Sequence, residues 1–419
     1  MKLVNQQLIK NTNLKLLYNS VFHNRGISRA DLARQTGLSR TAVSALVDEL
    51  AEAGFVRDAG SSAGWEEMQR MAGCANLSSA VAENASGARR KAGRKPNSLE
   101  LCSGNYYVLV FGWETDSVQV HLADISGAVS RHEEIGKGSS DSYIQLCRTW
   151  LDGLLASTVT RRQLLGICFV LPAMLDPTER TAFSTTVSLE YDGGGEGVFS
   201  RLQEAFPEHA VAVLNDTACA AYAEKVYTGV TEKDFAFIRF DRGIGAALFI
   251  QDRLLGDACA SHTQFGHFSI SPDGPPCACG NRGCLEMLLR EDRLPERLPQ
   301  KNIPLTYESL GQSALYGDTA SMQTIRDMAF EFSLALANLV CLVHPSLIVL
   351  GGRIRRLGPF FLEEVRRALT EHSFHKMTDT LRLRYSILDS NACYNGAMKY
   401  FFDRHYQFTA NMEHTFFIG

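Results

Sequence analysis

Beyond residue 103 the chain alternates short apolar runs with longer amphipathic stretches, and this alternation constrains its fold more than any other feature. Residues 106–113 read YYVLVFGW and residues 165–172 read LGICFVLP, lengths and compositions typical of buried strands. Similar runs predict strands at 117–124, 211–216, 234–240, 244–250 and 347–352, with helices at 142–157 and 321–343. Strands that alternate with helices in this way predict an α/β body.

The composition is that of a globular protein, with 45% hydrophobic and 21% charged residues in a chain of 419. That length predicts two or three domains. No apolar run reaches the roughly 20 residues of a membrane span. The first 20 residues interrupt their apolar positions with Asn, Gln and Lys, unlike a secretory signal. We therefore expect a cytoplasmic protein with no membrane partner, whose eleven cysteines stay reduced.

Charge is distributed unevenly along the chain. Residues 1–100 hold 14 Lys and Arg against 9 Asp and Glu, a net charge of +5, and the remaining residues have a net charge of −9. A basic front predicts contact with a polyanion, whereas an acidic body does not.

Residues 26–57 read GISRADLARQTGLSRTAVSALVDELAEAGFVR, which marks two short helices and the turn between them. Ser28 can cap the first helix, with Asp31 three residues later as a variant of the capping box, and Gly37 ends it. Ser39 can cap the second helix, whose apolar residues recur at helical spacing. These are Val43, Leu46, Val47 and Leu50. Together with a preceding helix at about 11–23, the pattern predicts a helix-turn-helix within residues 1–102.

The other face of the second helix presents small polar residues and one arginine near its amino end, which suits the base edges of the DNA major groove. The residues that we expect to contact DNA there are Ser39, Arg40, Thr41 and Ser44. GFVRD at 54–58 and SLEL at 98–101 predict the two strands of a wing, and hence a winged helix-turn-helix. An ordinary helical hairpin in a protein core is the alternative.

The wing contains an insertion at residues 59–92, rich in Ala, Ser and Gly, which predicts a flexible segment. A partner-binding element built on Trp65, Met68 and Met71 is the alternative. Around its end lies a basic cluster that we expect to contact DNA phosphates or enter the minor groove. This cluster consists of Arg89, Arg90, Lys91, Arg94 and Lys95. A solvated run of charge is the non-functional interpretation.

The stretch HFSISPDGPPCACGNRGCLE at 267–286 places one histidine and three cysteines at the spacing His-x9-Cys-x-Cys-x4-Cys. One nitrogen and three sulfurs suit tetrahedral zinc, and four protein ligands leave no open position, so the zinc would be structural. The predicted ligands are His267, Cys277, Cys279 and Cys284. A redox-active Cys-x-Cys pair is the alternative.

The chain resembles the ROK family of bacterial repressors and sugar kinases, in its repressor branch. The resemblance rests on the motif GH…CxCGxxGCLE and on HPSLIVLGG near the carboxyl end, and it covers roughly residues 5–58 and 93–405. It implies a two-lobed, actin-like and RNase-H-like sugar-kinase fold. We expect the lobes at 103–222 plus 386–405 and at 223–385, with a tail at 406–419.

The resemblance also implies a sugar site. Family kinases bind sugar hydroxyls with an Asn-Asp pair whose Asp is the general base, and VLNDTACAA keeps both residues. The zinc-binding histidine and the Glu of GCLE also face the sugar in the family. Two positions depart from the family, with Gln in place of Glu before Gly-His and Ser in place of Asn. The implied sugar-binding residues are Ser188, Asn215, Asp216, Gln264, His267 and Glu286.

The phosphate-binding motif of the family kinases is altered in this chain. Their Asp-x-Gly-Gly-Thr is replaced by a stretch within FGWETDS that carries Gly112, Glu114, Thr115 and Asp116 at the Asp, the two glycines and the Thr. Side chains would block the backbone amides, and each acid about 4 Å from a phosphate costs about 4 kcal/mol at a dielectric constant of 20. The second phosphate loop, residues 241–245, is half preserved. We therefore expect no kinase activity.

These features predict a zinc-containing transcriptional regulator, and in particular a repressor of carbohydrate-metabolism genes. It would bind operator DNA as a homodimer or homotetramer and sense a sugar or sugar derivative. One alternative is an active ATP-dependent sugar kinase with a DNA-binding head. Another is a regulator with a vestigial pocket that a protein partner controls.

Overall fold

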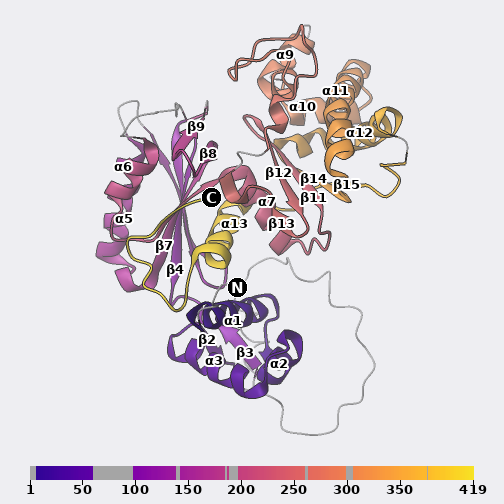
Figure 1. Cartoon of the computed structure of the whole chain (residues 1–419). Coiled ribbons are helices and arrows are strands. Elements are labelled where there is room, and N and C mark those ends of the chain that lie inside the picture. The colour runs from indigo at the N-terminus through magenta and orange to yellow at the C-terminus, as the bar shows by residue number, and fades with distance from the viewer. Residues whose placement is uncertain are drawn as a thin grey trace. The chain divides into compact units, whose positions relative to one another are not determined.

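The computed structural model describes residues 6–59, 98–137, 142–184, 186–187, 197–259, 263–298, 305–374 and 376–419 (Figure 1). The chain divides into two compact units. The first unit comprises Met1–Tyr107, Asp124–Ala128 and Gln407–Asn411, and the second comprises Val108–Ala123, Val129–Tyr406 and Met412–Gly419. Residues 60–92 of the expected wing insertion and the basic cluster at 89–95 lie outside the described residues.

The first unit contains the predicted winged helix-turn-helix. Its elements are α1 (Gln6–His23), β1 (Ile27–Ser28), α2 (Arg29–Thr36), α3 (Arg40–Glu52), β2 (Val56–Asp58) and β3 (Ser98–Leu101). Ser28 accepts a hydrogen bond from the Asp31 backbone N–H at the start of α2, and Gly37 ends α2 with φ +73. Ser39 accepts from the Ala42 N–H at 3.2 Å to begin α3. The sequence-based caps are therefore confirmed.

Strand pairing and burial complete this unit. β3 pairs antiparallel with β2, as predicted, and also with the two-residue β1, which the sequence did not reveal. The core is made by Leu14, Leu17, Val21, Leu32, Val43, Val47 and Leu50, all at most 2% exposed. The Phe408 N–H donates to Asn11 Oδ1 at 2.8 Å. Part of the segment that was expected to be a tail therefore packs against α1.

The described part of the second unit has two large sheets. The first has the strand order β16-β10-β7-β4-β5-β6. These strands are β4 (Tyr107–Trp113), β5 (Ser117–Asp124), β6 (Val129–Gly136), β7 (Leu164–Leu171), β10 (Val211–Asn215) and β16 (Phe416–Ile418). Its helices are α5 (Tyr143–Ser157) and α6 (Val198–Ala205), and a hairpin joins β8 (Met174–Asp176) to β9 (Thr181–Phe183).

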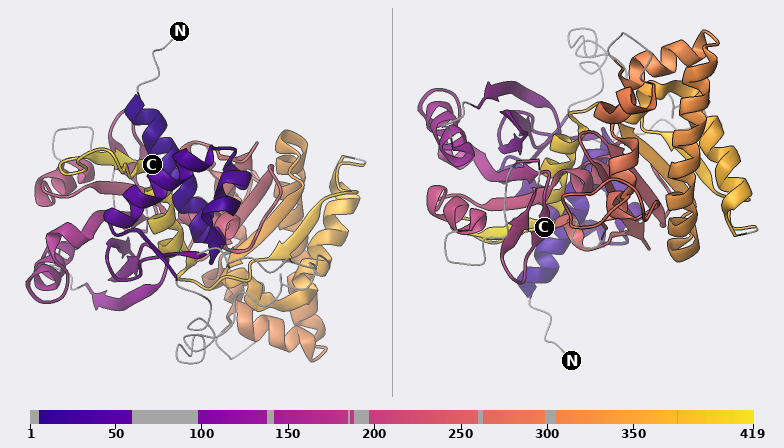
Figure 2. Two further views of the ribbon diagram at one scale, coloured as in Figure 1. Left: turned by 90° about the horizontal axis from the view of Figure 1, so that it is seen from below. Right: turned by 90° about the horizontal axis from the view of Figure 1, so that it is seen from above.

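The second sheet has the order β13-β12-β11-β14-β15. These strands are β11 (Phe235–Phe240), β12 (Ile244–Ile250), β13 (Arg253–Leu254), β14 (Leu347–Gly352) and β15 (Arg382–Tyr385). The helices α10 (Tyr307–Leu315), α11 (Thr319–Val343) and α12 (Gly358–His372) lie on its outer side (Figure 2). α11 covers the helix predicted at 321–343 and buries Met328 and Phe332 in this layer's core.

Two helices, α7 (Asp216–Tyr227) and α13 (Ala392–Tyr400), pack against each other; α7 also packs against strands of both sheets, and α13 against β7. The strands of the two sheets fall within the two expected lobes, with the exception of β16. The expectation of a tail at 406–419 is wrong here, because the apolar residues 416–418 form a strand that pairs parallel with β10. None of the described helices is long and apolar enough to cross a membrane.

Candidate functional sites

The amino end of α3 presents the side chains that we expected to contact DNA. Arg40 and Thr41 are exposed, and Ser44 is half-buried. Ser39 is exposed, although its hydroxyl oxygen also caps α3. Arg29, at the start of α2, donates to the Asp48 carboxylate at 2.6 Å and to the Ser44 carbonyl oxygen at 3.4 Å, which fastens α2 to α3. The four candidate residues therefore share one end of a helix with fixed orientation.

The four predicted metal ligands meet in space. Their ligand atoms all lie within 4.8 Å of one another. His267 Nδ1 is 3.5 Å from Cys277 Sγ, and Cys279 Sγ is 3.6 Å from Cys284 Sγ. A tetrahedral zinc ion bound at about 2.3 Å to each sulfur would separate the sulfurs by about 3.8 Å. The side chains present therefore fit a tetrahedral ion.

Local turns produce this cluster. Gly280 and Gly283 have φ +90 and +61, and a Cβ at residue 283 would lie 1.6 Å from the Ser271 carbonyl oxygen, so that position requires glycine. Cys284 directly precedes α8 (Leu285–Leu289), the helix that carries Glu286 in its first turn. Burial raises the pKa of the Cys284 thiol to about 12. Thiols this close together therefore stay protonated unless a cation stabilises them as thiolates.

The Asn-Asp pair lies where β10 passes into α7. Asn215 is 6% exposed; its Oδ1 accepts from the Ala218 N–H at 2.9 Å, and its Nδ2 donates to the Ala173 carbonyl oxygen at 2.9 Å. Asn215 is thus engaged as a helix cap. Asp216 Oδ1 accepts from the Thr217 N–H at 2.7 Å.

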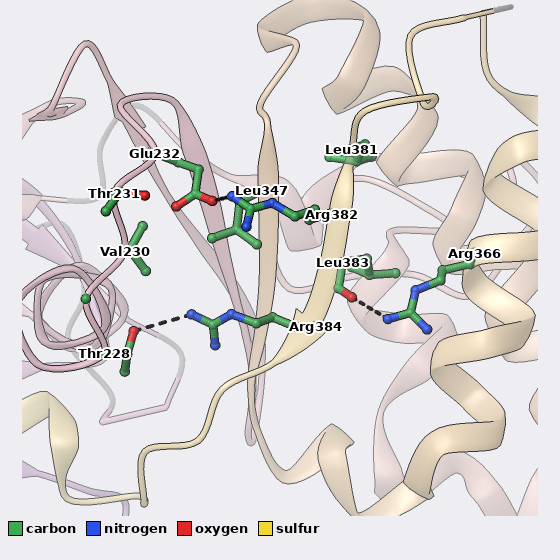
Figure 3. Close-up of a pocket in the computed structure, with 11 residues that line it drawn as sticks. Thr228, Val230, Thr231, Glu232, Leu347, Arg366, Leu381, Arg382, Leu383 and Arg384 are labelled. Carbon is green, nitrogen blue, oxygen red and sulfur yellow. Dashed lines mark hydrogen bonds and ion pairs between the residues drawn. The ribbon is translucent and has the colours of Figure 1, made fainter. Parts of the chain in front are cut away.

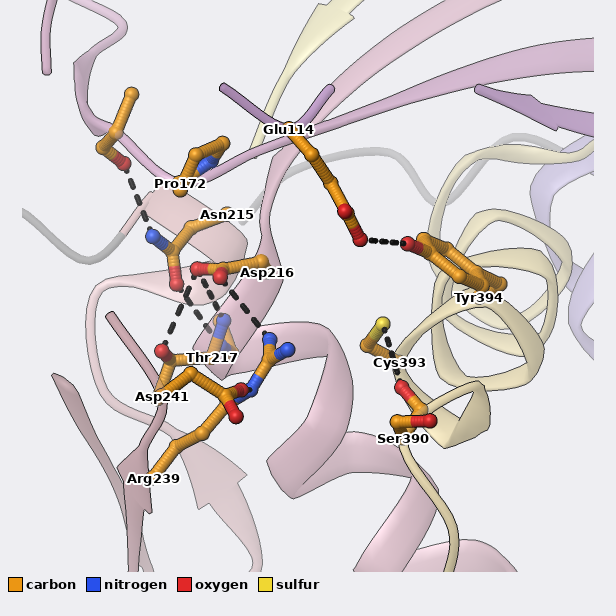
Figure 4. A network of polar contacts seen from close by, with 12 residues as sticks. Glu114, Pro172, Asn215, Asp216, Thr217, Arg239, Asp241, Ser390, Cys393 and Tyr394 are labelled. Atoms are coloured by element: carbon orange, nitrogen blue, oxygen red, sulfur yellow. Dashed lines mark hydrogen bonds and ion pairs between the residues drawn. The ribbon is translucent and has the colours of Figure 1, made fainter. Parts of the chain in front are cut away.

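Arg239 lies beside Asp216, and no sequence pattern predicted it as part of this site. Its Nη1 donates to Asp216 Oδ2 at 3.0 Å and its Nε donates to Asp241 Oδ2 at 2.5 Å, so one guanidinium joins two carboxylates (Figure 4). The Arg239 side chain is 17% exposed and that of Asp216 is 24% exposed. Burial raises the pKa of the Asp216 carboxyl, and the Arg239 guanidinium opposes this shift. The sequence feature that could have identified Arg239 is the presence of an arginine within the otherwise apolar strand FAFIRF.

Tyr394 fills the space beside Gly112, at the start of the altered phosphate motif. A Cβ at residue 112 would lie 2.3 Å from the Tyr394 ring. The Tyr394 hydroxyl donates to Glu114 Oε1 at 3.5 Å, and Figure 4 shows the two side chains pointing toward each other. Burial raises the pKa of Tyr394 far above its usual range, so the hydroxyl keeps its proton.

The turn between β11 and β12 links the remaining candidates. The Ile244 N–H donates to Glu286 Oε2 at 2.8 Å, and a Cβ at residue 243 would lie 2.5 Å from that oxygen. Arg242 lies 4.0 Å from the exposed Asp116. Gln264 is exposed, and Ser188 lies outside the described residues. Asp216 and Glu286 are therefore both linked to the turn between β11 and β12. Glu286 bonds the Ile244 N–H directly, whereas Asp216 bonds Arg239, which also bonds Asp241.

Comparison with known families shows to which family the chain belongs. The chain matches the ROK family over residues 116–403, more than half of its length. The chain therefore belongs to the ROK family. Residues 10–57 match a winged helix-turn-helix DNA-binding family, in agreement with the first unit.

Relatives of similar length share both parts. This ROK chain is 24% identical over 399 residues to the xylose repressor of Bacillus subtilis, covering 94% of this chain and 95% of the relative. It is 21% identical to the DNA-binding transcriptional dual regulator NagC of Escherichia coli, covering 92% and 91%. These curated relatives are named as regulators rather than as enzymes.

Solved structures confirm the predicted fold. A ROK family transcriptional regulator, a homolog of the E. coli MLC protein, matches with a TM-score of 0.72 at 19% identity, covering 94% of this chain and 97% of that one. A ROK family glucokinase from Streptomyces griseus, in complex with glucose and AMPPNP, matches with a TM-score of 0.55 at 19% identity, covering 70% and 98%. The expected winged helix-turn-helix followed by a sugar-kinase body is therefore confirmed.

Proposed function

We propose that this ROK protein is a DNA-binding transcriptional regulator that represses carbohydrate-metabolism genes in response to a sugar or sugar derivative. One observation carries the proposal: a single chain joins a winged helix-turn-helix to a ROK body, and relatives matched along more than nine-tenths of it are named repressors. Its site of action would be the cytoplasm, where operator DNA is accessible.

DNA recognition is assigned to the amino end of α3. Ser39, Arg40, Thr41 and Ser44 would meet base edges in the major groove. The basic cluster of Arg89, Arg90, Lys91, Arg94 and Lys95, which lies outside the described residues, would contact phosphates. A homodimer or homotetramer would present paired heads to a symmetric operator.

The sugar would bind beside the turn between β11 and β12. Asp216 and Glu286 offer carboxylate oxygens there, and the further residues assigned to the sugar are Ser188, Asn215, Gln264 and His267. Asn215 supports this assignment least, because its amide already bonds Ala218 and Ala173. Carboxylates that accept hydroxyl protons suit a polyol.

The body would act as a sensor rather than as a kinase. Gly112, Glu114, Thr115 and Asp116 replace the motif that binds phosphate and metal, and Tyr394 occupies the space in which a larger side chain at residue 112 would have to fit. Arg239 holds Asp216, the residue at the general-base position, in an ion pair. A base that already accepts from a guanidinium is less able to take a hydroxyl proton.

Zinc is the proposed resident metal. His267, Cys277, Cys279 and Cys284 would hold it with all four positions filled, so its role would be to stabilise the loop that leads to Glu286. A sugar that binds the body would then shift the equilibrium between two arrangements of the DNA-binding heads.

A mobility-shift experiment tests this function. The full chain is mixed with DNA from upstream of its own gene, with and without a panel of sugars and sugar derivatives. We expect a specific complex whose amount changes with one sugar class. Sustained ADP release from ATP and a sugar, abolished in Asp216→Asn, would instead identify a kinase. A complex that no carbohydrate changes, together with no thermal stabilisation by any of them, would contradict the sensing role.

A further inference from the structure

A cavity lies at the end of the second sheet opposite to the turn between β11 and β12. Its volume is about 520 Å³, and it is formed by the loop after α7, the first residues of β14 and β15, and one residue of α12 (Figure 3). The turn that carries Asp241 follows the carboxyl end of β11, whereas this cavity adjoins the amino ends of β14 and β15. It is therefore separate from the proposed sugar site. Its volume is that of a pocket for a small molecule.

The charged side chains that line this cavity are mostly positive. They are Arg366, Arg382, Arg384 and Glu232. Arg384 has a fixed structural partner, because its Nη1 lies 2.7 Å from the Glu224 carboxylate, which is 0% exposed. Glu224 also accepts from the Ser386 hydroxyl at 2.6 Å. Arg384 therefore neutralises a buried acid, and Arg366, Arg382 and Glu232 together set the charge of the cavity, which is positive.

Arg382 and Arg366 retain unused hydrogen-bonding capacity. Arg382 is 66% exposed and forms an ion pair with Glu232, whose side chain is only 9% exposed. Arg366 Nη2 donates to the Leu383 carbonyl oxygen at 2.6 Å, and within the described part of the chain Arg366 has no acidic partner. Each guanidinium carries five N–H donors, so Arg366 can donate to an oxyanion while it keeps its bond to the Leu383 carbonyl oxygen, and Arg382 can do so when it leaves Glu232.

We propose that this cavity binds a small organic phosphate, held by Arg366 and Arg382. Arginine matches the geometry of phosphate oxygens with two parallel hydrogen bonds, and the cavity has room for more than the phosphate group itself. Glu232 forms an ion pair with Arg382. Glu232 therefore competes with the ligand for the same guanidinium.

Helix α7 joins this cavity to the proposed sugar site. It begins at Asp216, and its carboxyl cap is Thr228, which lines the cavity and whose hydroxyl lies 3.3 Å from Arg384 Nη2. Twelve residues of helix span about 18 Å. A ligand that displaces Glu232 moves the loop directly after this helix. The phosphate compound would thus be a second effector of the ROK body, in addition to the sugar.

Calorimetric titration of the full chain with glucose 6-phosphate tests the proposal, with glucose and inorganic phosphate as the matched probes. We expect glucose 6-phosphate to bind, and Arg366→Gln and Arg382→Gln each to weaken it about tenfold, the effect of losing one charge-assisted hydrogen bond. Glu232→Gln should strengthen binding several-fold, because it removes the competing carboxylate. Arg253→Gln, at the opposite edge of the same sheet, should leave binding unchanged.

The results separate this site from the sugar site. Binding that is lost in Glu286→Gln but kept in Arg366→Gln and Arg382→Gln would place the phosphate in the sugar site and overturn the proposal. Equal heats for glucose and glucose 6-phosphate, or no binding of any phosphate compound, would also overturn it. Tighter binding of inorganic phosphate than of glucose 6-phosphate would exclude an organic ligand. Circular dichroism and zinc content verify the fold of each variant, and no step requires DNA or a sugar response.

Discussion

Arg239 and Asp216 form an ion pair of 3.0 Å between β11 and the first residue of α7, and Arg239 also donates to Asp241. Both side chains are less than one quarter exposed. A carboxylate at this depth needs a partner for its charge, and Arg239 supplies it. The pair therefore has a structural role in addition to its influence on Asp216 as a proton acceptor.

Removal of Arg239 should destabilise the body. Arg239→Leu leaves two acids at residues 216 and 241 without their cation, and we expect a loss of about 2 kcal/mol in the free energy of unfolding. Urea denaturation measures it. The double variant Arg239→Leu with Asp216→Asn should recover part of the loss, because one uncompensated charge is gone. Equal stability of Arg239→Leu and the parent chain would contradict the described ion pair.

Gly112 should not tolerate even one added methyl group. In Gly112→Ala the new Cβ would lie 2.3 Å from the Tyr394 ring, and we expect a loss of about 1–3 kcal/mol from overpacking. Gly136→Ala is the control, since a Cβ there meets nothing within 4 Å. Tyr394→Leu should relieve much of the penalty when combined with Gly112→Ala. Additive effects of the two substitutions in denaturation experiments would show that they are not in contact.

Loss of one thiolate should release the metal. Cys279→Ser removes one of four ligands, and we expect the zinc content, measured by atomic absorption, to fall from about one ion per chain to a small fraction of that value. Cys341→Ser is the matched control, because Cys341 is also exposed but lies outside the cluster. Full metal content in Cys279→Ser would disprove the ligand set.

Arg40 should determine sequence preference on DNA. Arg40→Ala removes a side chain at the amino end of α3, and we expect preference for the specific operator over other DNA to fall by about 1–3 kcal/mol. Alanines at Arg89, Arg90 and Lys91 should instead weaken binding to all sequences and flatten the salt dependence. Arg34→Ala, on α2, serves as the control. Unchanged preference in Arg40→Ala, measured by competition, would remove α3 from the recognition role.

Stability should decline in mild acid because of His121. Burial lowers the pKa of His121 to about 4, and its Nε2 lies 3.2 Å from Asn395 Oδ1 while its Nδ1 faces His132 Nδ1 at 3.3 Å. The unfolded chain takes up this proton near pH 6.5 and the folded chain only near pH 4, so unfolding becomes easier as pH falls between these values. We expect about 2 kcal/mol less stability at pH 5 than at pH 7 from this residue. His121→Gln should reduce that difference in urea denaturation, and an identical pH profile would refute the assignment.

Sequence patterns predicted the features that short-range physical chemistry determines. Ser28, Gly37 and Ser39 were identifiable as caps because a helix end needs donors or acceptors within three residues of itself. The His-Cys cluster was identifiable because its cysteines lie within eight residues of one another. Arg239 and Tyr394 were not, because their partners are 23 and 280 residues away and only the fold brings them together. Asn215, by contrast, was expected from the sequence to bind the sugar, and in the fold its side chain caps α7.

The pairing of β16 with β10 has a consequence for biosynthesis. About 200 residues separate the two strands, so at 5–20 residues per second the ribosome completes β10 roughly 10–40 seconds before β16 emerges. During that interval the outer edge of β10, with the apolar sequence VAVLN, has unpaired backbone groups that other nascent chains can join. Chaperones that shield such an edge during translation should therefore increase the yield of soluble protein.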